Sequence, residues 1–186
     1  MIRLGDYGIP MMFALSLATG LPAGATAQHD HSPYEDHTGR EIAALSPDDV
    51  EALRAGEGMG YALAAELNGY PGPRHVLDLG AELDLSERQR TAVEDVFQRM
   101  RSAAVDLGEE LVAAERALDE LFASGSATED DLDRLTREAA SLEGRLRAIH
   151  LRAHLETADL LAEEQIEAYR QLRGYGEGHD AGGSEP

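Results

Sequence analysis

The pattern of apolar and polar positions is most regular between residues 86 and 123. From Val93 onward, apolar and small residues recur at alternating spacings of four and three, which is typical of a helix with one packed side. Ser86 and Gln89 have the spacing of a capping box that begins a helix. The pattern predicts one helix over 86–123, roughly 57 Å long. Its apolar seam comprises positions 93, 97, 100, 104, 107, 111, 114, 118 and 121.

A second seam follows the stretch ASGSAT (123–128), whose small residues predict a turn. The members of this seam are Leu132, Leu135, Ala139, Leu142, Leu146, Ile149 and Ala153. Two such seams joined by a short loop predict a long antiparallel helical hairpin. A last helix is expected over about 162–173, and it should end at Gly174.

Short flanking helices are expected before the hairpin. Ser46 and Pro47, followed by two acidic residues, predict a helix start. The pattern of small and apolar residues predicts that this helix continues to Leu67. The stretch YPGP (70–73) then breaks the chain direction, and a further short helical stretch is expected over 74–83.

The predicted fold class is all-α, with a long antiparallel helical hairpin and short flanking helices, because no segment shows the period of a strand. The helical domain should span 46–173, and the polar residues 174–186 predict a disordered tail. A hairpin this thin buries little apolar surface by itself. We therefore expect a homodimer.

The N-terminal sequence predicts export. Residues 1–27 combine a short apolar run with Ala25-Thr26-Ala27, the small-x-small pattern of a cleavage site. The run is too short for an ordinary membrane-spanning helix. We expect a signal peptide cleaved after Ala27, a periplasmic mature protein in a Gram-negative cell, and no membrane insertion after cleavage. Residues 28–45 lack helical period and predict a flexible arm rich in His and acidic residues.

The net charge of the chain restricts the classes of molecule that it is expected to bind. It has 36 acidic and 16 basic residues, for a net charge of −20. This charge repels nucleic-acid phosphates and anionic membrane surfaces, so neither is an expected partner. It favours basic proteins and metal ions. The chain contains no Cys, which excludes disulfides and thiolate metal sites.

Two histidines are the candidate metal ligands of the hairpin. His150 and His154 are four residues apart, which places both imidazoles on one side of a helix, one turn apart. They fall at the edge of the apolar seam, so a half-exposed pair is expected. Such a pair can bind Zn²⁺, Ni²⁺ or Cu²⁺ with further ligands. The alternative is a half-exposed pair without a ligand. Leu151 stands where a metalloprotease motif needs Glu, which excludes that chemistry.

Further ligands would come from neighbouring segments. With the turn near residue 125, antiparallel packing places 150 beside about 100 and 154 beside about 96. Met100 and Glu94 are therefore candidates from the first long helix. His75 and Glu66 are candidates from the N-terminal segments.

The N-terminal arm offers a separate candidate site. His29 and His31 lie there among acidic residues, and a short His-rich tract is a compositional signal of metal binding. Such a site would be loose and low in specificity, because its ligands become ordered only on binding. A polar arm without a ligand is the alternative.

Two short motifs carry a resemblance to a known family. The stretches LSERQ (85–89) and LAEEQ (161–165) resemble the paired LTxxQ boxes of the Spy/CpxP-like periplasmic proteins and of their heavy-metal sensor and resistance relatives. The resemblance covers residues 75–173. In the second box Ala162 replaces Thr and removes the capping hydroxyl. The resemblance implies a bent, all-helical dimer without catalysis. Members act as ATP-independent chaperones, as stress modulators or as metal-binding sensors.

These observations favour a binding protein over an enzyme. The chain shows no nucleophile elbow and no phosphate-binding loop with its Lys. The expected function is a periplasmic metal-responsive binding protein centred on His150 and His154, of the heavy-metal sensing, resistance or envelope-stress type. The alternative is an ATP-independent chaperone for unfolded or basic client proteins. A third interpretation is a structural partner of an inner-membrane sensor.

Overall fold

The structure is a computed structural model that describes residue 34 and residues 37–175. These residues form helices and no strand, with one isolated β-bridge between Ile42 and Leu45. The all-α fold class is confirmed. The helices are α1 (Pro47–Ala55), α2 (Leu63–Glu66), α3 (Pro73–Asp78), α4 (Glu87–Ala123), α5 (Glu129–Leu160) and α6 (Glu163–Leu172). Over the described ranges, no helix is long and apolar enough to cross a membrane.

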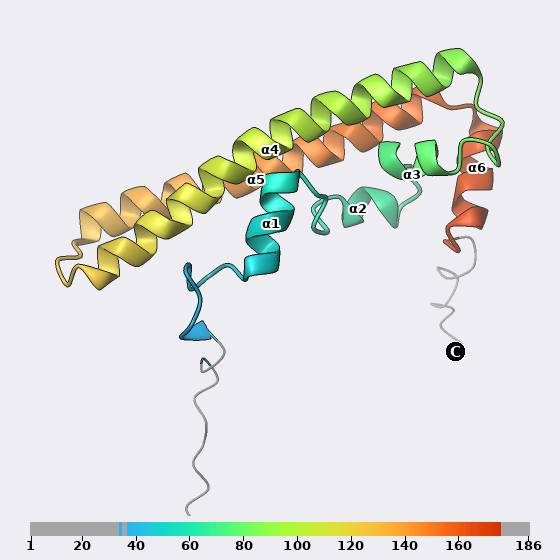
Figure 1. Cartoon of the computed structure of the whole chain (residues 1–186). Helices are drawn as coiled ribbons and strands as arrows, with labels where there is room; N and C mark the ends of the chain where they lie inside the picture. The colour runs from blue at the N-terminus through green and yellow to red at the C-terminus, as the bar shows by residue number, and fades with distance from the viewer. Residues whose placement is uncertain (1–33, 35–36, 176–186) are drawn as a thin grey trace, which may run out of the picture. The chain divides into compact units, whose positions relative to one another are not determined.

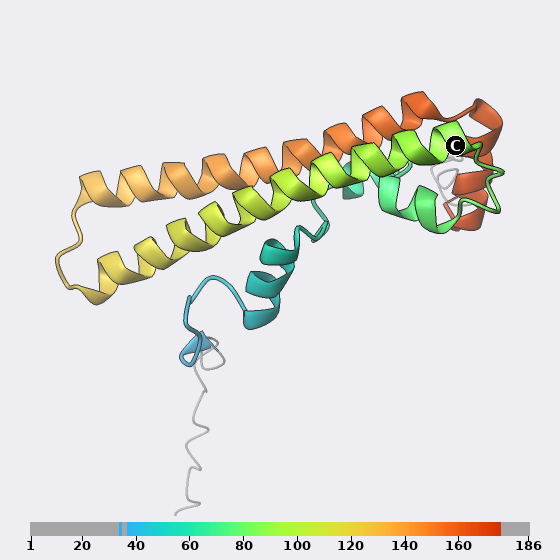
Figure 2. The same cartoon turned by 45° about the horizontal axis from the view of Figure 1, so that its top comes forward.

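The two long helices, α4 and α5, run side by side in opposite directions and are joined by a turn (Figure 1, Figure 2). Ser86 caps α4 by accepting a hydrogen bond from the backbone N–H of Gln89, and the Gln89 side chain accepts one from the backbone N–H of Ser86. This is the predicted capping box. Thr128 caps α5 in the same way through the backbone N–H of Asp131. The caps therefore set where both long helices begin.

The first helix is shorter than the sequence predicts. Ser46 and Asp49 form a reciprocal capping box at its start. Gly56 ends it in the left-handed conformation, with φ at 68°. The chain then turns again at Gly60, where φ is 77°. The predicted helix from 47 to 67 is therefore wrong: residues 56–62 form a loop, and α2 is a separate short helix.

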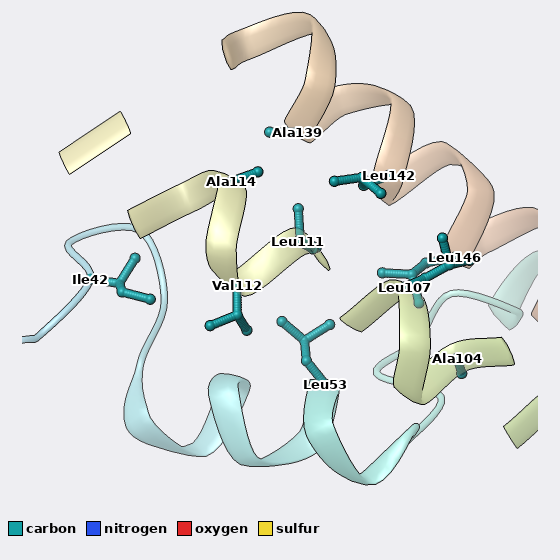
Figure 3. Packing of buried hydrophobic residues seen from close by; sticks show 10 residues of the cluster. All are labelled: Ile42, Leu53, Ala104, Leu107, Leu111, Val112, Ala114, Ala139, Leu142 and Leu146. Carbon is teal, nitrogen blue, oxygen red and sulfur yellow. The ribbon is translucent and has the colours of Figure 1, made fainter. Parts of the chain in front are cut away.

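The main core lies where α1 crosses the α4–α5 pair (Figure 3). Seam residues from both long helices face each other there, and Leu53 of α1 packs against them. The buried members are Ile42, Leu53, Ala104, Leu107, Leu111, Val112, Ala114, Ala139, Leu142 and Leu146. Gly108 lets α1 approach closely, because a β-carbon there would lie against the Leu53 carbonyl oxygen and 2.8 Å from its carbonyl carbon.

Part of the expected flexible arm packs on α4. Ile42 is only 2 % exposed and belongs to the main core. The backbone N–H of Ala43 donates to Asp119 at 2.7 Å, and Arg116 pairs with Glu41 at 2.8 Å. The packed part of the chain therefore begins before residue 46, because an apolar side chain at 42 has a place in the core.

A second cluster joins the other end of the long pair to α3 and α6. Val76, Leu83, Val93 and Tyr169 are its buried members. In Figure 1, α6 lies beside α3 at this end. Tyr169 is completely buried, and a buried phenol hydroxyl usually has a hydrogen-bond partner.

Candidate functional site

A cavity of about 330 Å³ lies between the long pair and the segment that runs from α1 to α3. Its lining includes three histidines and one methionine: His75, Met100, His150 and His154. They come from α3, α4 and α5, so three helices converge on it. The candidates His75 and Met100 thus reach the same cavity as the histidine pair.

His150 is buried, with 3 % of its surface exposed. Its Nδ1 lies 2.9 Å from the Leu146 carbonyl oxygen. Because a carbonyl oxygen only accepts, Nδ1 carries the proton and Nε2 keeps its lone pair. Nε2 is buried and has no hydrogen-bond partner among the described residues. His150, one of the residues that line the cavity, therefore has a buried lone pair without a hydrogen-bond partner among the described residues.

The expected half-exposure of the pair is wrong. The loop that follows α1 and the start of α2 cover this face of α5, and the Tyr61 ring lies 5.6 Å from the His150 ring. Burial lowers the pKa of His150 below its ordinary value, against the opposing effect of its hydrogen bond to Leu146. The imidazole is therefore neutral at pH 7, which is the form that binds metal.

His154 has the same proton arrangement. It is 8 % exposed, and its Nδ1 donates to the Tyr70 carbonyl oxygen at 2.8 Å. Its Nε2 lies next to Gly72, where an added β-carbon would be only 3.1 Å from that nitrogen. Glycine at position 72 therefore leaves room beside the second lone pair.

Glu66 connects this region to the C-terminal helix. It is 6 % exposed, and its Oε1 accepts hydrogen bonds from Tyr169 at 2.6 Å, from Tyr175 at 3.1 Å and from Arg173 at 3.3 Å. Burial alone would raise the pKa of Glu66. The hydrogen bond from Tyr169 and the nearby His75 outweigh burial, so the pKa lies below its ordinary value. Glu66 is therefore an ionised carboxylate inside the fold.

The other Glu66 oxygen, Oε2, lies near His154. Oε2 lies 3.7 Å from Nδ1 of His154 and has no hydrogen-bond partner among the described residues. Glu66 thus lies on the Nδ1 side of the His154 ring.

Among the described sequence candidates, Glu94 does not line the cavity. Glu94 is exposed on α4 and is not among the residues that line the cavity. His29 and His31 lie outside the described residues. Within the described part of the chain, no group of three or more His, Cys, Asp or Glu side chains is arranged to hold a metal ion. Besides the exposed Glu57, the side chains of the cavity lining that can bind a metal are imidazoles and a thioether.

The positive groups near the cavity are engaged elsewhere. Arg101 lines the cavity, and its Nε donates to the Ala55 carbonyl oxygen at 3.1 Å. Arg74 also lines it and pairs with Asp78 at 3.3 Å. These guanidinium groups lower the affinity of the cavity for highly charged cations without closing it.

The two LTxxQ-like boxes meet at the end of the long pair. The Gln89 side-chain N–H donates to the Gln165 side-chain oxygen at 2.7 Å. Each amide also reaches across to a backbone carbonyl: Gln89 to Leu160 at 3.0 Å and Gln165 to Leu83 at 2.9 Å. In the second box only Gln165 caps, by accepting from the backbone N–H of Ala162. The glutamines thus join the start of α4 to the start of α6.

Comparison with known proteins gives no match: no protein-family model, no curated protein and no solved structure matches the chain. The resemblance to the Spy/CpxP-like proteins therefore stays a prediction from the sequence. The evidence for the candidate site is the geometry of its own residues.

Proposed function

We propose that the chain is a non-enzymatic, metal-responsive binding protein that holds a metal ion at Nε2 of His150 and of His154. The unpartnered, buried Nε2 of His150 carries the proposal. Buried polar atoms are almost always hydrogen-bonded, and leaving one unsatisfied costs about 1–3 kcal/mol. A bound cation would supply the missing partner. In both histidines the other ring nitrogen donates to a backbone carbonyl, as metal-binding imidazoles do.

The cellular location and the partners that we propose for this function are those predicted from the sequence. A periplasmic location places the site where external metal concentrations change. The helical hairpin would act as a homodimer and report occupancy to an inner-membrane sensor, in heavy-metal resistance or in envelope stress. Mass spectrometry of the exported chain should find an N-terminus at Gln28. An intact N-terminus in the membrane fraction would contradict export with cleavage.

Thermal denaturation of the mature chain with Zn²⁺, Ni²⁺ and copper tests the site. A bound ion should stabilise the protein by mass action, by about 2.7 kcal/mol at a hundredfold excess over the dissociation constant. His150→Ala and His154→Ala should each remove most of this gain, and the double variant should lose little more. His37→Ala, at a partly exposed histidine outside the cavity, is the matched control and should keep it.

The arm is tested separately. Removing residues 28–36 deletes His29 and His31 but keeps Ile42 in the core. Metal stabilisation should survive this deletion. If the deletion abolishes it while both alanine variants of the pair keep it, the metal binds the arm and the cavity is not the site.

Two glycines allow a finer test of where the ion lies. Gly72→Ala would place a methyl group 2.9 Å from Cε1 and 3.1 Å from Nε2 of His154 and so displace this ring, whereas Gly58→Ala has nothing closer than the His150 ring at 4.0 Å. The Gly72 backbone, with φ at −79°, accepts alanine without strain. Gly72→Ala should therefore weaken metal binding, and Gly58→Ala should not. Equal affinities would place the ion away from His154.

A chaperone function is the second candidate, and exposed apolar side chains around α2 favour it. Met59, Leu63, Leu67 and Tyr70 are 39 %, 55 %, 61 % and 44 % exposed. Apolar groups gathered on a surface often mark a binding site for another protein. With a net charge of −20, the clients would be basic. Leu63→Ser with Leu67→Ser should then abolish protection of a basic client from aggregation. Unchanged protection would remove this candidate.

A further inference from the structure

We infer that the cavity selects a soft monovalent cation, Cu(I), over Zn²⁺ and Ni²⁺. The inference rests on the proposed function, because it names which metal ion that site takes. It follows from the ligand types, from the charge around the cavity and from the apolar character of its walls.

The ligand types favour Cu(I). The cavity is lined by His150 and His154 and, on the facing helix, by Met100, whose side chain carries a thioether. Thioether sulfur is a soft ligand that selects Cu(I), whereas structural Zn²⁺ takes thiolate, imidazole and carboxylate in fourfold coordination. The described residues provide no cluster of three or more His, Cys, Asp or Glu for such a shell. Cu(I) is stable at lower coordination numbers, which two imidazoles and a thioether satisfy.

The charges around the cavity also favour Cu(I). Arg74 and Arg101 line the cavity, and the acidic residue among the lining residues, Glu57, is exposed. Glu66 lies behind His154 rather than in the cavity wall. The desolvation penalty of an ion rises with the square of its charge, so a divalent ion pays about four times the penalty of a monovalent one. Without a carboxylate ligand to offset it, this difference favours the monovalent ion.

Part of the cavity wall is apolar. Phe97, Ala62 and Pro73 line the cavity beside the candidate ligands. Met100 is half-buried, and together with Ala153 of α5 it also lines a second, smaller pocket.

The test compares metals on the mature chain. Ag(I) serves as a redox-inert probe, and Cu(I) is supplied without oxygen in competition with a chromogenic chelator. Ag(I) and Cu(I) should raise the melting temperature more than Zn²⁺ or Ni²⁺ at equal concentration. Met100→Leu, nearly equal in volume, should weaken Cu(I) binding by at least about tenfold while the metal-free protein melts unchanged. Met59→Leu, at an exposed methionine outside the cavity, is the matched control.

The outcomes separate the two proposals. If Zn²⁺ or Ni²⁺ binds more tightly than Cu(I), or if Met100→Leu leaves Cu(I) affinity unchanged, the selectivity is wrong while the metal-binding function stands. If Glu57→Gln abolishes binding of all metals, a carboxylate is a ligand and the selectivity is likewise wrong. If no metal stabilises the wild-type chain, both proposals fail. X-ray absorption of the Cu(I) complex should show one sulfur ligand that Met100→Leu removes.

Discussion

Gly108→Ala is a sharp probe of how α1 sits on the long pair. Position 108 is inside α4, where alanine normally stabilises a helix by about 1 kcal/mol relative to glycine. Here the added β-carbon would be 2.8 Å from the carbonyl carbon of Leu53 and closer still to its oxygen. The obstacle is the backbone of α1 rather than a flexible side chain. The helix must therefore move as a unit.

The cost of that movement can be set against the gain. Overpacking in a core typically costs about 1–3 kcal/mol. Moving α1 also weakens the burial of Leu53, whose full burial contributes about 1.5–3 kcal/mol. After subtracting the helix-propensity gain, the free energy of unfolding should fall by about 1–2 kcal/mol. For a chain of this size the melting temperature should drop by roughly 2–8 °C.

Gly144→Ala is the matched control, and thermal denaturation followed by circular dichroism is the assay. Gly144 lies in α5, and nothing stands within 4 Å of its added β-carbon. This variant should be more stable than the wild type by about 0.5–1 kcal/mol. The two substitutions should therefore have opposite signs. If Gly108→Ala stabilises as much as Gly144→Ala, α1 does not pack on α4 at this point.

Three other contacts give testable outcomes. In a double-mutant cycle with Gln89→Ala and Gln165→Ala, urea denaturation should show a coupling of roughly 0.5–1.5 kcal/mol, and strict additivity would mean the side-chain pair contributes nothing. Leu142→Glu buries a charge and should lower the free energy of unfolding by roughly 2–5 kcal/mol, whereas Glu110→Ala, at an exposed position, should lower it by at most about 0.5 kcal/mol. Equal losses would refute the packing of the apolar seam. Burial lowers the pKa of His150 in the folded protein. As pH falls, His150 is therefore protonated in the unfolded chain at a higher pH than in the folded protein. The free energy of unfolding of the metal-free protein should therefore fall as pH drops below about 6.5, by up to roughly 1.4 kcal/mol per pH unit. The urea midpoint of His150→Leu should depend less on pH than that of the wild type. Identical slopes would contradict the burial of this imidazole.

The long helices could be predicted because their signals are local. The capping box of Ser86 and Gln89 involves residues three apart, and a helix brings such residues together regardless of the rest of the fold. The seam repeat likewise follows from helix geometry. Leu111 and Leu142, for example, are both 5 % exposed. Local chemistry also explains the error at α1, because Gly56 stopped a helix whose apolar pattern continued beyond it.

The cavity could be predicted only in part, because its walls come from distant segments. The register of two antiparallel helices placed Met100 near the histidine pair. The burial of His150 depends on the loop that carries Tyr61, and no repeat in the sequence positions that loop. The partners of Glu66 are still more remote, since Tyr169 is 103 residues away along the chain. Such contacts follow from tertiary packing and leave no periodic signal.

The two imidazoles differ in what fixes them, and this difference determines how the site can respond. His150 donates to Leu146 within its own helix, so its orientation belongs to α5. His154 donates to Tyr70, in the segment between α2 and α3, so its orientation depends on how that segment packs. Glu66, at the end of α2, lies 3.7 Å from His154 through Oε2 and accepts a hydrogen bond from the Tyr169 side chain of α6 through Oε1. Any ligand that needs both Nε2 atoms must therefore stabilise the docked arrangement of α2, α3 and α6 on the long pair.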